Sequence, residues 1–222
     1  MRAVLTPADG LLRVGHPGHR ASGSVGGALG LLMLFGALYG AVMGSYGGFV
    51  GEMRPLQMLY SGLKVPLLLL VSFCLSLPSF FVINTLLGLR ADSLAAVRAL
   101  VVAQAGLTII LAAMAPLTVL WYVSFASYPA AILFNGLLFA IASASAQLIL
   151  RRLYQPLIQR NPRHRVMRWF WLVIYVFVAI QMAWVLRPFV GAPGMPTRFF
   201  RDEAWGNAYV EIVNIFVRLF GG

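Results

Sequence analysis

The sequence predicts an all-α fold, a polytopic membrane helical bundle with about five transmembrane helices and a C-terminal interfacial amphipathic helix. Two features of composition and one of patterning support this prediction. Of the 222 residues, 60% are hydrophobic and only 10% are charged, whereas a soluble domain has about 45–50% apolar and about 25% charged residues. The apolar residues gather in long runs with most of the arginines between them. The composition excludes an ordinary soluble globule and a disordered chain, and the single cysteine, Cys74, excludes a disulfide-stapled module.

Five apolar runs reach the roughly 20 residues that a helix needs to cross a bilayer core of about 30 Å. They cover approximately residues 25–46, 65–87, 99–122, 129–150 and 169–190. We expect helices because each unpaired backbone group in lipid costs several kcal/mol, and the alternating pattern of a membrane barrel is absent. A cleaved signal peptide is the alternative for the first run, although a signal has a shorter apolar core of about 7–15 residues. The predicted divisions are a flexible cytoplasmic segment (1–24), the five-span domain (25–190), and an extracytoplasmic turn with the amphipathic helix (191–222).

The net charge of +11 comes from 17 Lys and Arg against 6 Asp and Glu. These basic residues lie in short segments between apolar runs, which is typical of the positive-inside rule and does not indicate a nucleic-acid surface. With the N-terminus inside, eleven basic residues are cytoplasmic and six are outside. The segment RRLYQPLIQRNPRHRVMR decides the orientation, because the opposite loop, WYVSFASYP, carries no charge. We therefore expect a multi-pass protein of a bacterial cytoplasmic (inner) membrane, with its C-terminus extracytoplasmic.

Small residues form a stripe along the first run. Gly36, Gly40, Gly44 and Gly48 recur at every fourth position and share one helix face. In lipid, small residues let two helix backbones approach closely, and this drives packing. The stripe is predicted to pack against another span of the chain or against a second subunit. Gly136, Ala140 and Ala144 form a weaker stripe on the fourth run, and the two faces could pack on each other.

Prolines interrupt two of the runs. Pro78 lies within the second and Pro116 late in the third, and serine, threonine, asparagine and glutamine residues lie nearby. Proline kinks beside polar groups can mark a substrate site in transporters, although hydroxyl groups also serve to satisfy the carbonyls that a proline frees. No Asp, Glu, Lys or His falls inside the predicted spans, whereas ion-coupled pumps usually keep such a group at membrane depth.

Catalytic and metal-binding patterns are not found. The histidines, His16, His19 and His164, fall in loops, and no GxSxG, HExxH or P-loop sequence occurs. We therefore predict a protein that is not an enzyme and needs neither a metal nor another cofactor.

Candidate interface and lipid-binding residues lie near the ends of the spans. Arg151 and Arg152 would sit at the cytoplasmic surface, where a basic loop attracts anionic lipid or simply sets topology. On the other side, Trp184 and Arg187 would reach headgroups, or Arg187 would pair with an acidic residue. Trp205 belongs to the apolar face of the amphipathic helix, which would lie flat on the membrane or dock on a neighbour.

The segments YGAVMGSYGG, KVPLLLL and WVLRPFVGAPG resemble a family of bacterial multispan inner-membrane proteins whose function is uncharacterised. The similarity covers most of residues 31–209 and implies no activity. The five spans and the sequence TLLGLRADSLAAVRAL also resemble, more faintly, the five-span Yip-domain family, whose members serve trafficking or complex assembly in eukaryotes. The early motif of the eukaryotic members is missing here.

These features favour a non-enzymatic structural, accessory or assembly subunit of a membrane complex. Its expected partners are membrane lipids and other membrane-protein subunits or further copies of itself, with no nucleic acid. The alternative is a small channel or transporter with a polar site between the kinked second and third spans.

Overall fold

The computed structural model describes residues 25–51 and 53–200, and every regular element in these ranges is a helix. The long helices are α2 (Val25–Gly44), α4 (Pro55–Leu86), α5 (Ser93–Ser124), α6 (Tyr128–Arg160) and α7 (Arg163–Leu186). A short helix α3 (Tyr46–Val50) extends the first of them, and a 3₁₀ turn η1 (Arg90–Asp92) precedes α5. The described residues thus contain five helices long and apolar enough to cross a membrane. The predicted all-α, multi-pass bundle is confirmed, whereas the predicted C-terminal amphipathic helix lies mostly outside the described residues.

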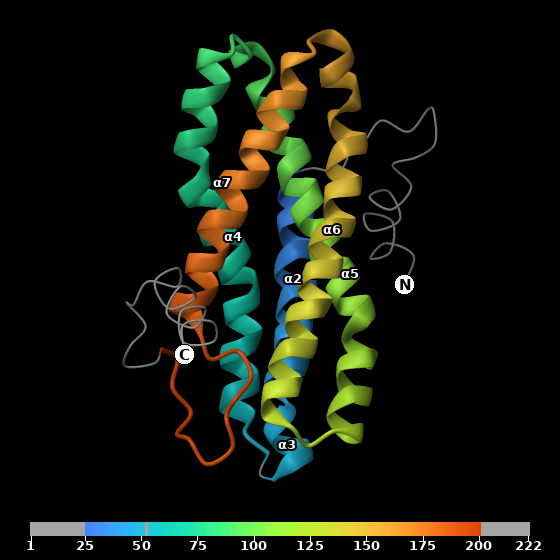
Figure 1. Ribbon diagram of the computed structural model, residues 1–222, viewed down its shortest axis with the longest axis vertical. Helices are drawn as coiled ribbons and strands as arrows, with labels where there is room; N and C mark the ends of the chain where they lie inside the picture. The colour runs from blue at the N-terminus through green and yellow to red at the C-terminus, as the bar shows by residue number, and fades with distance from the viewer. Residues whose placement is uncertain (1–24, 52, 201–222) are drawn as a thin grey trace, which may run out of the picture.

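The helices run up and down along one long axis (Figure 1). α2 packs between α4 and α5, α7 packs on α4, and α6 packs on α5. α6 and α7 follow each other in the chain, but they touch far less than the other neighbouring pairs do. The bundle is therefore closed around α2 and open between α6 and α7.

Most of the helices are longer than the apolar runs that predict them. α4 begins at Pro55 and α6 continues past Arg151 and Arg152, because a helix that satisfies its own backbone can carry polar turns beyond the hydrocarbon layer. The fifth predicted span is an exception at its end, since α7 stops at Leu186 and does not continue to residue 190.

These longer helices correct the expectation that no Lys or His lies inside a span. Lys64 lies on α4 and His164 lies in the first turn of α7, and both side chains are fully buried. The prediction missed them because Lys64 directly precedes an apolar run and His164 lies between arginines.

The arrangement also separates the two proline-containing spans. Pro78 and Pro116 lie inside continuous helices, α4 and α5. Because α2 lies between these helices, α4 and α5 touch each other little. The polar residues of the two spans therefore do not form one shared surface.

One end of the bundle is held by the only acidic residue in the described ranges. Asp92 accepts from His164, with 3.2 Å between Oδ2 and Nε2, and its Oδ1 lies 3.6 Å from a guanidinium nitrogen of Arg160. The guanidinium of Arg163 donates to the carbonyl of Leu87 at 3.2 Å. These contacts tie the α4–α5 turn to the α6–α7 turn at the arginine-rich end.

Candidate functional site

The glycine stripe of α2 lies at a close crossing with α4. A Cβ atom on Gly40 would lie 2.2 Å from the carbonyl oxygen of Ser61, and one on Gly44 would lie 2.8 Å from that of Gln57. At Gly36 the neighbours, Pro66 and Thr108, are at ordinary contact distance, and at Gly48 the nearest atom belongs to Met53, 3.7 Å away. The stripe thus packs within the chain, and its closest contacts are at Gly40 and Gly44.

The chain that follows α7 is fastened to the side of α4 by carbonyl contacts. Lys64 Nζ donates to the carbonyl of Pro188 at 2.7 Å, and the hydroxyl of Ser61 donates to that of Phe189. Gln57 Nε2 also donates to the Phe189 carbonyl at 3.2 Å. Residues 187–190 are not helical, so their carbonyls need donors, and polar side chains of α4 supply them.

Farther along, the same segment is held by a charged side chain and by an aromatic contact. Arg54 donates to the carbonyls of Ala192 and Met195 at 3.2 and 2.6 Å. The ammonium of Lys64 lies 4.9 Å from the ring centre of Phe199. We name residues 187–200 the strap, because they run along α4 and are fixed to it at several points.

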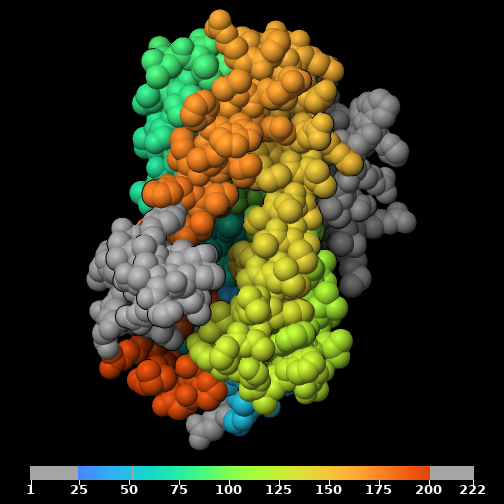
Figure 2. Space-filling view, in the orientation of Figure 1, coloured from blue at the N-terminus to red at the C-terminus, as the bar shows by residue number. Residues whose placement is uncertain are grey.

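A groove of about 910 Å³ lies between α6 and α7. Figure 2 shows it as a hollow between these two helices, with other helices visible at its bottom. Its floor comes from α4 and α5, and residues of the strap form one end. Ligand sites typically have volumes of about 300–1,000 Å³. The groove has the size of a binding site.

The wall that α6 contributes includes a run of small side chains. Gly136, Ala140, Ser143 and Ala144 line the groove, and a Cβ atom on Gly136 would meet nothing within 4 Å. The predicted small-residue face of α6 therefore does not meet the glycines of α2. At about 1.5 Å per residue, the lining residues of α6 from Ile132 to Gln147 extend over about 22 Å.

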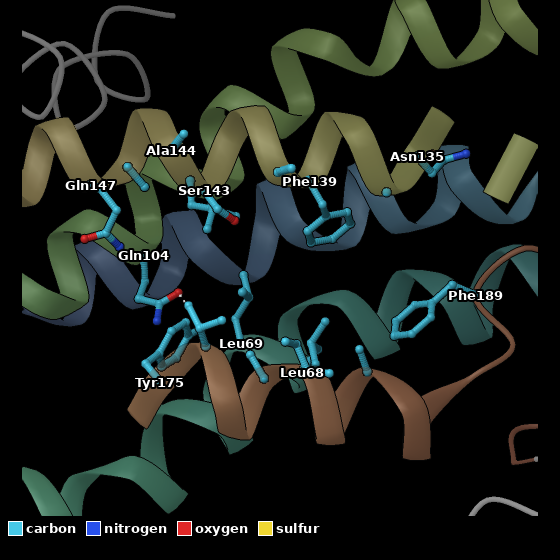
Figure 3. A pocket seen from close by; sticks show the side chains of 18 of the residues that line it. Leu68, Leu69, Gln104, Asn135, Phe139, Ser143, Ala144, Gln147, Tyr175 and Phe189 are labelled. Carbon is cyan, nitrogen blue, oxygen red and sulfur yellow. Dashed lines mark hydrogen bonds between the residues drawn. The ribbon is translucent and has the colours of Figure 1, made fainter. Parts of the chain in front are cut away.

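Polar side chains gather at one end of the groove. Gln104 of α5, which is 7% exposed, accepts a hydrogen bond on Oε1 from the Tyr175 hydroxyl at 3.1 Å. Gln147 of α6 lies at the same end, with Ser143 one turn before it (Figure 3). Among the described residues, neither the Gln104 nor the Gln147 amide nitrogen has a hydrogen-bond partner. An apolar groove thus contains two amide groups with unused hydrogen-bonding capacity.

The opposite end combines an aromatic side chain with a cation. Phe189 lies there (Figure 3), and Arg187 also lines the groove. The Arg187 guanidinium carbon lies 3.3 Å from the ring centre of Trp184, a cation–π arrangement. The predicted interface residues Trp184, in the last turn of α7, and Arg187, just after it, therefore contact each other beside the groove.

Arg151 and Arg152 lie on α6 beyond the glutamine end, and both are exposed. Trp205 lies outside the described residues. The buried lysine and the strap contacts were missed from the sequence. The signal for the polar end was present, because Gln104 and Gln147 interrupt apolar runs, but no pattern in the sequence shows that they meet.

Comparisons of the chain with protein-family models, with curated proteins and with solved structures give no match. The class of protein therefore rests on the fold and the groove: a multi-pass α-helical membrane protein with a ligand-sized hollow between its last two described helices.

Proposed function

We propose that the protein is a non-enzymatic accessory subunit of a membrane complex, and that it works by holding a lipophilic molecule in the groove between α6 and α7. The observation that carries this proposal is the 910 Å³ hollow with small side chains along one wall and apolar side chains along most of the others. In a bilayer, such a hollow is filled by a lipid chain or another apolar molecule, because water would gain few hydrogen bonds there.

The polar groups of the groove favour binding over chemistry. Gln104, Gln147, Ser143 and Tyr175 offer amides and hydroxyls, which orient a ligand by hydrogen bonds. A mainly apolar pocket with a few placed polar groups is the usual design of a ligand site. The arrangement supports recognition of an apolar molecule that carries a hydrogen-bonding group near one end.

The experiment compares two tryptophan variants of the full-length protein. Ala140→Trp fills the groove, whereas Ala113→Trp adds the same bulk to an exposed position on α5 outside it. Both variants are purified in mild detergent, and co-purifying lipids and protein chains are identified by mass spectrometry. We expect Ala140→Trp to lose a bound lipophile, and with it a partner chain, that Ala113→Trp retains. Identical contents in the two variants would contradict the proposal.

A small transporter is the second candidate, and one observation favours it. α7 ends beside a buried lysine, and the unwound residues after it present carbonyls to α4, as discontinuous helices do in many transporters. This polar region lies between α4 and the strap, not between the second and third spans as the sequence suggested. Solute uptake by proteoliposomes, lost on Lys64→Met, would favour transport over accessory binding.

A further inference from the structure

The polar end of the groove is lined by Gln104 and Gln147, and basic side chains lie one helical turn beyond it. Gln147 is followed one turn later on α6 by Arg151, which shares its helix face. On α7, Arg168 lies one turn before the groove-lining Trp171. Arg168 is subject to the positive charges of Arg151, which lies on α6, and of Arg165, one turn before it on α7. By helix spacing, Arg151 and Arg168 therefore lie one turn beyond the groove-lining residues Gln147 and Trp171, next to the polar end of the groove.

Asp92, the only acidic residue in the described ranges, pairs with other groups and not with these cations. Asp92 is occupied by His164 and Arg160. Positive charges at the ends of neighbouring helices repel, and an anion bound beside them relieves the repulsion. Phosphate suits arginine because its oxygens accept paired N–H bonds. The mouth of the groove is complementary to a phosphate group.

The side-chain amides of Gln104 and Gln147 can donate hydrogen bonds to the part of the ligand that follows its phosphate. The Gln104 side chain is more than nine-tenths buried, and its amide nitrogen has no partner among the described residues. Because Gln104 lines the groove, a ligand that supplies an acceptor gives this donor a hydrogen bond. The amide of Gln147 adds a second donor at the same depth. Two carbonyl oxygens just inside a phosphate-binding mouth match the two ester groups of a glycerophospholipid.

The remainder of the groove suits acyl chains. It runs for about 22 Å, past Gly136 and Ala140 on one side and α7 on the other, which exceeds half of a bilayer core of about 30 Å. We infer that the groove binds an anionic glycerophospholipid, with its phosphate at Arg151 and Arg168, its ester carbonyls at Gln104 and Gln147, and its chains along α6 and α7. This inference rests on the proposed function and names the ligand of the same groove.

The test adds lipid to the delipidated full-length protein in mild detergent and measures by native mass spectrometry how much of it binds. The probes are dioleoyl phosphatidylglycerol, phosphatidylcholine with the same chains, and an ether-linked phosphatidylglycerol that lacks the ester carbonyls. For the wild type we expect about fivefold or greater preference for phosphatidylglycerol over phosphatidylcholine. We also expect about fivefold weaker binding of the ether lipid, because it offers no ester carbonyls to the amides.

Matched variants assign the two contacts. Arg151→Gln and Arg168→Gln should each lower phosphatidylglycerol binding about fivefold, while Arg152→Gln, with the same change of charge on a different helix face, should lower it less than twofold. The double variant Gln104→Leu, Gln147→Leu should bind the ester and ether lipids equally. Elution as a single folded species and an unchanged helical spectrum show that each variant is intact.

The outcomes separate this inference from the proposed function. Equal binding of phosphatidylglycerol and phosphatidylcholine by the wild type overturns the inference, as does an equal loss in the Arg151→Gln and Arg152→Gln variants. If the double leucine variant still prefers the ester lipid to the ether lipid, the assignment of the ester carbonyls to Gln104 and Gln147 is wrong. If an isoprenoid quinone outcompetes phosphatidylglycerol, the ligand is not a glycerophospholipid. If one of these outcomes is found but Ala140→Trp still removes the bound molecule, the inference about the lipid fails and the proposed function is supported. If Ala140→Trp changes nothing, both fail.

Discussion

Lys64 Nζ donates a hydrogen bond to the carbonyl oxygen of Pro188, 2.7 Å away, and thereby joins the middle of α4's first half to the chain just beyond α7. The lysine is fully buried, and its neighbours Ser61 and Gln57 donate to the next carbonyl of the same segment. A buried cation is costly unless it is hydrogen-bonded. The Pro188 carbonyl of the strap accepts that bond. The side chains of α4 thereby satisfy strap carbonyls that have no partner within a helix.

Replacing this lysine should loosen the strap. In Lys64→Met the Pro188 carbonyl keeps only Gln57 Nε2, at 3.5 Å, and the loss of a hydrogen bond to a charged group costs about 1.5–3 kcal/mol. We expect faster protease cleavage within residues 187–200 and a lower thermal midpoint. The control is Leu63→Met, which changes an exposed neighbour on the same helix. Equal cleavage rates in the two variants would show that the lysine does not hold the strap.

Gly40 should tolerate no side chain at all. A methyl group there would meet the backbone of Ser61 at 2.2 Å, so α2 and α4 must move apart in Gly40→Ala, and overpacking of this kind costs about 1–3 kcal/mol or more. Gly30 lies on the same helix, and a methyl group there would meet nothing within 4 Å. We therefore expect Gly30→Ala to be neutral or slightly stabilising, since alanine has the higher helix propensity. Yield and thermal unfolding in detergent measure both effects, and similar values would contradict the close crossing.

The fold and the site were predictable from the sequence to different degrees. Length and hydropathy decide where helices form, because each span must satisfy its own backbone in lipid. The strap was not predictable, since its contacts join Lys64 to residues more than a hundred positions away. The groove was not predictable for a related reason: the small residues of α6 predict close packing, but the position of α7 on α4 leaves their face open. Tertiary arrangement, which hydropathy does not encode, decides whether a small-residue face becomes a contact or a cavity.

Two buried tyrosines should respond in opposite ways to loss of the hydroxyl. The Tyr154 hydroxyl has no hydrogen-bond partner among the described residues, so Tyr154→Phe removes an unsatisfied buried group and should be neutral or stabilising by about 1 kcal/mol. The Tyr39 hydroxyl donates to Asn135 Oδ1 at 2.9 Å, and Tyr39→Phe should destabilise by about 1 kcal/mol because the asparagine loses a donor. Thermal unfolding of the two variants side by side checks the sign. A loss of stability in Tyr154→Phe would show that its hydroxyl has a partner.

The distribution of arginine predicts an orientation in the membrane, which can be measured at the two ends of α6. In a Cys74→Ser background, Ser127→Cys places a thiol in the uncharged α5–α6 turn, and Gln159→Cys places one in the arginine-rich end of α6; both positions are exposed. The positive-inside rule places the arginine-rich end in the cytoplasm. A membrane-impermeant maleimide should therefore label Ser127→Cys in intact cells and Gln159→Cys only after permeabilisation. The reverse pattern would invert the orientation, and labelling of both sites in intact cells would show that α6 does not cross the membrane.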